Sequence, residues 1–571
     1  MHKKSCDIIK NRQIDILPNY ISDQKKIFHK STSKLFTIAY YIALNNRPFT
    51  DFPKLIKLMK LFEVDVGESL HDRNTCKNMI SVVARYFRLK LSELINQANK
   101  ITIIVDESDT IANEPALIIY LKTVIESKPT TFFLDIVKLN NKDAQSVFES
   151  IINSLKYFGL SKNKIDNDII EVVSDGASTF LGRKSGVGSK FLMKNPNTII
   201  WHCLCHRLEL SVADAKASFK QFATFTEVLR EIYKFYSQSS KNTAEIKAIS
   251  AELDQKFQKI GKVFTIRWSA SSFNTVKAVK NNLEPLVKHF QLKYIICKEE
   301  SKKERLRFVL TNLRSKVFSE NLNIIYEALE ELTILSSLLQ KRDLNMIDAH
   351  NLIMNSVQVL KNKSEKYCEQ SNKDIIDRKK FFFELAKCIK QRSMSTIYRS
   401  NMTKAEKTEK LEEYVSLLSD MKICDRKYFP ENHSSDYGDE KIQRISKIWG
   451  LEETKLKIDF RNYKMFGEID GEFRKFKDIS NTLCISSADA ERGFSQMNLI
   501  INEMRSNLTI ENASNLMLIR CFGMPIDEFE TNGCVKMWLS ENHNLATCNK
   551  NINRSEKENL NDNDFLYKYL K

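Results

Sequence analysis

Three acidic side chains stand beside apolar segments that lie far apart in the sequence. Asp106 ends the β-branched run Ile101–Val105, Asp175 follows the run Ile169–Ser174, and Glu491 lies at the start of an amphipathic helical pattern. Mg²⁺ or Mn²⁺ prefers carboxylate and water oxygens, and two such ions about 4 Å apart can hold both the attacking and the leaving oxygen of an in-line displacement at phosphorus. We therefore predict that Asp106, Asp175 and Glu491 are catalytic residues and ligands of a two-metal site.

The alternative for each acid is structural, because a carboxylate that closes a strand is more often a turn former or a helix cap. The metal hypothesis rests on the three acids together and on their order along the chain. A sheet that holds such side chains rigidly while leaving them open to solvent is the support that a catalytic group needs.

The elements around the first two acids follow a definite order. Three apolar runs, Ile101–Val105, Ala116–Ile125 and Thr131–Lys138, are separated by short Pro-containing connections and predict an antiparallel meander. A helical pattern over Ala144–Leu160 precedes the strand Ile169–Ser174, which we expect to be parallel to its neighbour because a helix delivers it. This β-β-β-α-β order, with acids at the ends of the first and fourth strands, is typical of a ribonuclease-H-like core.

The predicted fold class is therefore α/β, with a ribonuclease-H-like core interrupted by a large all-helical insertion, so that the chain as a whole is mostly α. The last predicted helices are Glu491–Glu503 and Glu511–Cys521. The predicted divisions are a basic helical region 1–100, the first part of the core 101–218, the helical insertion 219–476, the return of the core with a dimerisation region 477–525, and a partly disordered tail 526–571.

The composition favours an anionic partner. The 571 residues carry a formal net charge of +17, and such an excess is typical of proteins that bind DNA, although a Lys-rich solvated surface would give the same number. Twelve cysteines without a closely spaced even framework indicate free thiols in a reducing compartment. No apolar run reaches the roughly 18 residues that span a bilayer, so no membrane partner is expected.

Three further motifs have a functional and a structural interpretation. Cys203 and His206 resemble half of a zinc site, but no second ligand pair exists, so a structural role is favoured and no zinc is expected. Arg267 and Trp268 could hold a phosphate and stack on an unpaired base, or could seal a domain joint. Arg492, beside Glu491, is also predicted to contact DNA.

The run Ile101–Glu107 resembles a SUMO-interacting strand, which is an aliphatic segment followed by acids. Its alternative, a central core strand, is favoured because a buried strand offers no free edge.

With these residues in view, the chain resembles the hAT superfamily of transposases and their domesticated descendants over about residues 30–525. Each block is short, but five occur in the family order. The blocks are Val105-Asp106-Glu107-Ser108, Ser174-Asp175-Gly176-Ala177, Cys203-Leu204-Cys205-His206, Arg267-Trp268-Ser269 and Ser486-Ser487-Ala488-Asp489-Ala490-Glu491-Arg492-Gly493-Phe494-Ser495.

The resemblance implies that Asp106, Asp175 and Glu491 match the DDE acids that cleave and join DNA, and that the C-terminal region forms a homodimer or a higher oligomer. It implies a nuclear protein. Residues 1–100 lack the ligand set of the zinc finger with which active relatives usually begin. The alternative is therefore a domesticated, non-catalytic nuclear dimer that binds DNA or protein, with SUMO-ligase-like or transcription-regulatory activity as variants.

Overall fold

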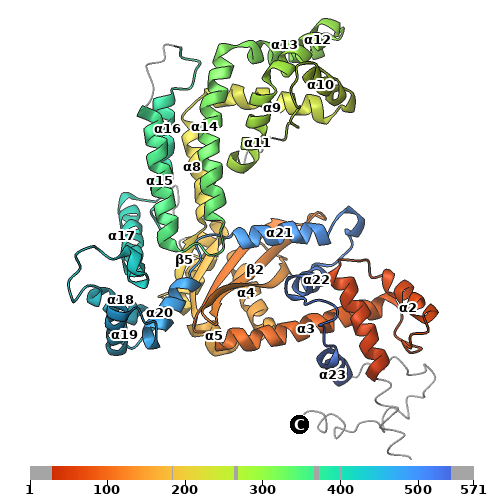
Figure 1. The fold of residues 1–571 in the computed structure, drawn as a ribbon, viewed down its shortest axis with the longest axis vertical. Helices are drawn as coiled ribbons and strands as arrows, with labels where there is room; N and C mark the ends of the chain where they lie inside the picture. The colour runs from red at the N-terminus through yellow and green to blue at the C-terminus, as the bar shows by residue number, and fades with distance from the viewer. Residues whose placement is uncertain (1–28, 183, 263–267, 366–371, 398–401, 542–571) are drawn as a thin grey trace, which may run out of the picture.

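A computed structural model describes residues 29–182, 184–262, 268–365, 372–397 and 402–541. The structure is mostly helical (66%) and contains one small mixed sheet. Figure 1 shows two main parts, which meet at an angle. We call the sheet with the helices around it the sheet lobe, and we call the helices α8–α16, which rise from it, the helical arm.

The sheet has five strands in the order β3-β2-β1-β4-β5. The meander β1 to β3 is antiparallel, whereas β4 is parallel to β1 and β5 is parallel to β4. The predicted antiparallel meander and the predicted parallel fourth strand are therefore confirmed. The strands are β1 (Ile101–Asp109), β2 (Pro115–Ile125), β3 (Lys128–Lys138), β4 (Ile169–Ser174) and β5 (Ile199–His202).

The central strand β1 differs from its prediction at its end. Asp106 does not close the strand, because β1 continues to Asp109, which pairs with Pro115 across a short turn into β2. Pairing to β2 on one side and to β4 on the other leaves β1 no free edge. The interpretation of Ile101–Glu107 as a central core strand is confirmed. Both edges of this strand pair with other strands, so it offers no free edge to which SUMO could bind.

Helices from both ends of the described chain surround the sheet. The helix α22 lies along β3, where the backbone N–H of Ile136 donates to Ser514 Oγ at 3.2 Å, so an edge that would otherwise expose backbone groups is covered. Residues 29–44 are helical. The other helices of the sheet lobe are α2 (Asp51–Leu61), α3 (Arg73–Gln97), α4 (Ala144–Phe158), α5 (Lys162–Asn167), α6 (Ser178–Leu181), α7 (Val187–Lys194), α20 (Gly471–Thr482), α21 (Ala488–Ile500), the 3₁₀ turn η3 (Glu503–Arg505), α22 (Ile510–Phe522) and α23 (Asn532–Ser540).

In its described residues the segment 219–476 contains helices and no strand, as its periodicity predicts. None of the helices in the described part of the chain is long and apolar enough to cross a membrane. The helices of the arm are α8 (Leu204–Ala217), α9 (Gln221–Ser237), α10 (Ser240–Glu252), α11 (Trp268–Asn281), α12 (Leu283–Ile296), α13 (Glu300–Arg314), α14 (Lys316–Leu339), α15 (Met346–Glu365) and α16 (Arg378–Ser393). Below them follow α17 (Lys404–Met421), η1 (Lys422–Cys424), η2 (Arg426–Tyr428), α18 (Asp439–Trp449) and α19 (Glu453–Phe466).

The helix α21 packs directly on the sheet. It contacts β1 and β2, and a Cβ atom added at Gly493 would lie 2.4 Å from Ile118 Cδ1 and 2.6 Å from Tyr120 Oη. Since real Cβ atoms do not approach so closely, glycine at this position sets how near α21 comes to the strands.

The last two predicted helices carry a stripe of apolar side chains, and from the sequence this stripe could form either a dimer interface or part of the core. The structure uses it for the core, because its members are buried within one chain, with the exception of Leu499, which is 57% exposed. The buried members are Phe494, Met497, Ile500, Leu516, Leu518 and Ile519.

The close approach at Gly493 predicts the effect of a single methyl group. Gly493→Ala should lower the free energy of unfolding by about 1–3 kcal/mol, because the overpacked methyl outweighs the better helix propensity of alanine. Urea denaturation followed by circular dichroism measures the loss. Ser495→Ala, on the exposed side of the same helix, is the matched control, and equal stability of the two variants would contradict this packing.

Candidate functional site

Asp106 projects from the sheet face that α21 covers. It pairs across the strands with Ile118, and residues directly opposite one another in an antiparallel pair point to the same face. Ile118 is also the side chain that Gly493 of α21 approaches. Asp106 is only 6% exposed, and its Oδ1 accepts a hydrogen bond from the backbone N–H of Glu107 at 3.0 Å.

Asp175 lies in a tight turn directly after β4. Its Oδ1 accepts from the backbone N–H of Ala177 at 3.0 Å, and its backbone carbonyl lies 2.9 Å from His202 Nε2. Burial lowers the pKa of His202 well below its usual value, so the ring is neutral and Nε2–H donates to this carbonyl. Gly176 has φ +96°, and a Cβ there would lie 2.1 Å from His202 Nε2, so the turn requires glycine.

The structure adds Glu107 to the acids that the sequence singles out. The pKa of its carboxyl is raised, first by burial and then by the negative charge of Asp175, while Lys142 opposes the shift. Its Oε1 is buried and has no hydrogen-bond partner. Glu107 and Asp175 are therefore near enough to repel each other. The only hint of Glu107 in the sequence is that it directly follows Asp106.

Glu491 lies in the first turn of α21 and is half-buried. The pKa of the Cys205 thiol is raised by its hydrogen bond to Cys203, by burial and, in smaller part, by the charge of Glu491, so Glu491 lies near Cys205. Within the described residues, no three His, Cys, Asp or Glu side chains are grouped so that they could hold a metal ion. The donor set of carboxylates suits Mg²⁺ or Mn²⁺, and the two-metal site stays a prediction.

The segment before α21 is held on the sheet by a buried carboxylate and a buried amine. Glu171 Oε2 accepts from the backbone N–H of Cys484 at 2.6 Å and from Thr102 Oγ1 at 3.1 Å. Lys122 Nζ donates to the carbonyl of Leu483 at 2.8 Å. Burial raises the pKa of Glu171 to about 8, and the hydrogen bond from Cys484 and the charge of Lys122 oppose this rise.

The next residues of this segment are held by β5 and the start of α8. Trp201 Nε1 donates to the carbonyl of Ile485 at 3.0 Å, and the backbone N–H of Ser487 donates to Cys203 Sγ at 3.2 Å. Cys205 Sγ lies 3.3 Å from Ser486 Oγ. We call Leu483–Ser487 the clamped segment, because side chains or backbone groups of the sheet and of α8 hold each of its residues.

Cys203, one of the two residues of the half zinc motif, thus has a structural contact. The other, His206, is half-buried, and its ring centroid lies 5.7 Å from that of His202. Of the predicted nucleic-acid contacts, Arg267 lies outside the described residues, and Trp268 begins α11 without a described side chain.

Arg492 is described, and its guanidinium is engaged within the protein. Its Nη2 donates to Asp489 Oδ1 at 2.8 Å and its Nη1 donates to the carbonyl of Gln340 at 3.3 Å. The side chain is 40% exposed. Arg492 therefore joins α21 to the foot of the helical arm, and its predicted contact with DNA stays a prediction.

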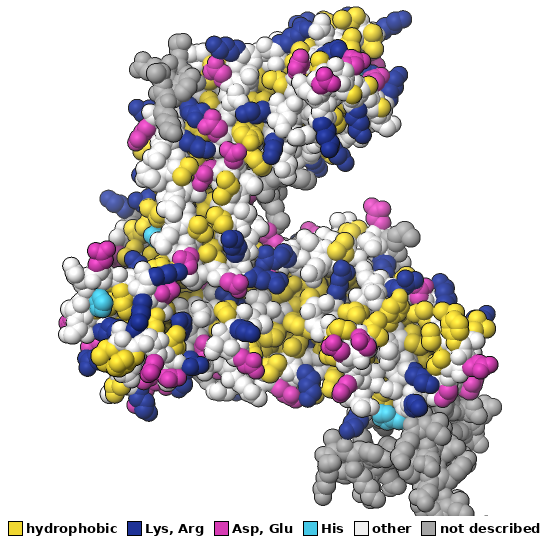
Figure 2. All heavy atoms as spheres, viewed as in Figure 1, with side chains coloured by type: hydrophobic (Ala, Val, Ile, Leu, Met, Phe, Trp, Pro, Cys, Tyr) yellow, Lys and Arg dark blue, Asp and Glu magenta, His cyan; other side chains and the backbone are white. Residues whose placement is uncertain are grey.

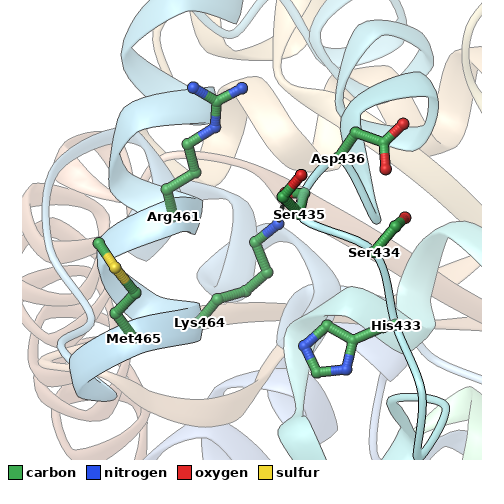
Figure 3. A pocket seen from close by; sticks show the side chains of 7 residues that line it. All are labelled: His433, Ser434, Ser435, Asp436, Arg461, Lys464 and Met465. Carbon is green, nitrogen blue, oxygen red and sulfur yellow. Dashed lines mark hydrogen bonds between the residues drawn. The ribbon is translucent and has the colours of Figure 1, made fainter.

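A hollow of about 490 Å³ lies elsewhere, between α19 and the exposed loop before α18 (Figure 3). Lys464 Nζ donates to the carbonyls of Ser435 and Tyr437 at 2.7 and 3.1 Å, so this lysine anchors the loop. The hollow is lined by His433, Ser434, Ser435, Asp436, Arg461, Lys464 and Met465. None of these residues belongs to the predicted site.

A search of known protein families found no family model that matches this chain.

The buried carboxyl of Glu171 predicts a dependence of stability on pH. Its pKa of about 8 in the folded protein lies above the reference value of 4.5, so between these values the unfolded chain loses this proton and the folded chain keeps it. The stabilisation is present below pH 4.5 and is lost as the pH rises through about 8. Glu171→Gln should therefore lose less stability than the wild type between pH 6 and 8.5 in urea denaturation. An identical pH dependence in both proteins would contradict a raised pKa at Glu171.

Proposed function

We propose that this protein is a hAT-type DNA transposase or a nuclear protein derived from one, with Asp106, Asp175 and Glu491 as the acids of DNA strand cleavage and transfer. The observation that carries the proposal is the arrangement of the sheet. Three antiparallel strands are followed by two parallel ones in the order β3-β2-β1-β4-β5, and the C-terminal α21 packs on β1 and β2. This order supports the expected ribonuclease-H-like core.

The three acids belong to neighbouring parts of this arrangement. Asp106 is on β1, Asp175 follows the adjacent β4, and Glu491 is on the helix that covers β1. This relation, with the acids on adjacent elements, supports the proposal, although the three carboxylates do not form a metal-binding group in the described structure.

The chemistry of the proposed site divides between metal and protein. Bound Mg²⁺ or Mn²⁺ would supply Lewis-acid stabilisation of the oxygens at phosphorus. Asp106, Asp175 and Glu491 would hold the ions, and Glu107 would add negative charge beside Asp175. Backbone N–H groups would keep Asp106 and Asp175 oriented, because each carboxylate accepts one such hydrogen bond. The clamped segment would fix the start of the helix that carries Glu491.

Strand cleavage is tested with a labelled DNA duplex and with supercoiled plasmid in the presence of Mg²⁺ or Mn²⁺. We expect nicked product that EDTA abolishes and that Asp175→Ala reduces to background. Asp166→Ala, which removes an exposed aspartate of α5 in an ion pair with Lys194, is the matched control and should retain the activity. Metal-dependent product that survives Asp175→Ala would remove Asp175 from the site.

The second candidate is a domesticated, non-catalytic nuclear protein that uses the same fold to bind DNA or protein as a dimer; SUMO-ligase-like or transcription-regulatory proteins belong to this class. The observation that favours it is the lack of a metal-binding group of three side chains within the described residues. Because the stripe of α21 and α22 is buried within the chain, a dimer through this region would use its outer side, where Leu499 is exposed.

The two candidates differ in strand cleavage. A scaffold should bind duplex DNA in a salt-sensitive manner and sediment as a dimer, but should yield no metal-dependent product. For that dimer, Leu499→Asp should shift sedimentation towards the monomer without changing the circular dichroism. Unchanged sedimentation would exclude this face as the interface.

A further inference from the structure

A buried carboxylate lies where the helical arm meets the sheet lobe. Asp489, in the first turn of α21, is 6% exposed, and its Oδ1 accepts hydrogen bonds from two arginines. Arg342 Nε donates at 2.9 Å from the loop between α14 and α15, and Arg492 Nη2 donates at 2.8 Å from the next turn of α21. Since a buried charge is costly unless it is paired, Asp489 holds both guanidinium groups in place.

The two arginines differ in how many of their guanidinium nitrogens remain for a ligand. Arg492 uses both terminal nitrogens inside the protein, on Asp489 and on the carbonyl of Gln340. Arg342 bonds Asp489 through Nε, and its side chain is 65% exposed. The bond through Nε leaves its two terminal nitrogens, which form the fork that matches a phosphate in a bidentate manner, outside the hydrogen bonds of the ion pair.

The surroundings of this ion pair are positive. Two guanidinium groups share one carboxylate, which leaves a net charge of +1 at the pair. Burial raises the pKa of the Cys521 thiol of α22, and the charges of Arg520 and Arg342 oppose the rise, so both arginines act on this thiol. Figure 2 shows Lys and Arg side chains gathered in the inner corner between the arm and the sheet lobe.

We propose that Arg342, oriented by Asp489, binds a phosphodiester of duplex DNA in this corner. The choice of DNA as the partner rests on the proposed function. The inference adds Arg342, a residue of the helical arm, to a site whose acids come from the sheet lobe. A phosphate held by Arg342 would lie beside the first turn of α21, the turn that also carries Glu491, the third predicted acid.

The test measures the binding of the full chain to a fluorescent DNA duplex at several salt concentrations. Arg342→Ala should weaken binding roughly tenfold at low salt, as expected for the loss of one charge-assisted contact. It should also reduce the slope of log K against log salt by about one, because one fewer counterion is released. Arg342→Lys keeps the charge and loses the fork, so it should retain the slope and bind with intermediate affinity.

The matched control is Arg474→Ala, which removes an arginine of α20 that is 52% exposed and paired with the N-cap residue Asp470. It should leave both affinity and slope unchanged. Equal affinity of Arg342→Ala and wild type, or an equal loss in Arg474→Ala, would overturn the assignment of Arg342 while DNA remains the partner. Wild-type protein that does not bind the duplex would overturn the proposed function as well, and binding without strand cleavage would leave the Arg342 contact standing.

Discussion

The position of α21 depends on the burial of polar groups in the clamped segment Leu483–Ser487. This segment crosses the sheet away from water, where each backbone N–H and carbonyl must find a partner or cost free energy. Glu171, Lys122 and Trp201 supply such partners from three different strands. The helix α21 begins at Ala488, directly after this segment. The hydrogen bonds of the segment therefore fix where the first turn of α21 lies.

This constraint links several features that are distant in the sequence. The glycine at position 493 lets α21 lie against β2, and the same first turns of the helix carry Asp489, Glu491 and Arg492. Through Asp489 and Arg492 the helix is joined to the loop at the foot of α14. The geometry of the predicted site and the attachment of the arm are therefore properties of one helix, and a change that moves it alters both.

The site combines buried and exposed charges in different ways. Burial raises the pKa of Glu107 and the charge of Asp175 adds to the rise, whereas Asp489 is paired with two arginines. Negative charges on β1 and directly after the neighbouring strand β4 favour a cation, and a fixed pair of guanidinium groups favours an anion. The proposed function, DNA strand cleavage with divalent metal ions, would use both kinds of surface.

The strands and the helical character of residues 219–476 could be predicted because their patterns are local. Apolar runs such as Ala116–Ile125 and helical spacing in α14 reflect burial that each element shows in its own residues. The predicted end of β1 at Asp106 was three residues short, because hairpin pairing with Pro115 to Leu117 extends the strand through polar residues, which an apolar pattern does not mark.

The sequence by itself determined which residue types are available: acids beside apolar runs, glycines at 176 and 493, and an excess of basic side chains. Only the tertiary structure decided that Glu107 lies near the charge of Asp175, that Arg342 bonds Asp489 across 147 positions, and that the stripe of α21 and α22 fills the core. The physical reason is that spacing in the sequence specifies the face of an element on which a side chain lies, whereas its partner depends on how the elements pack.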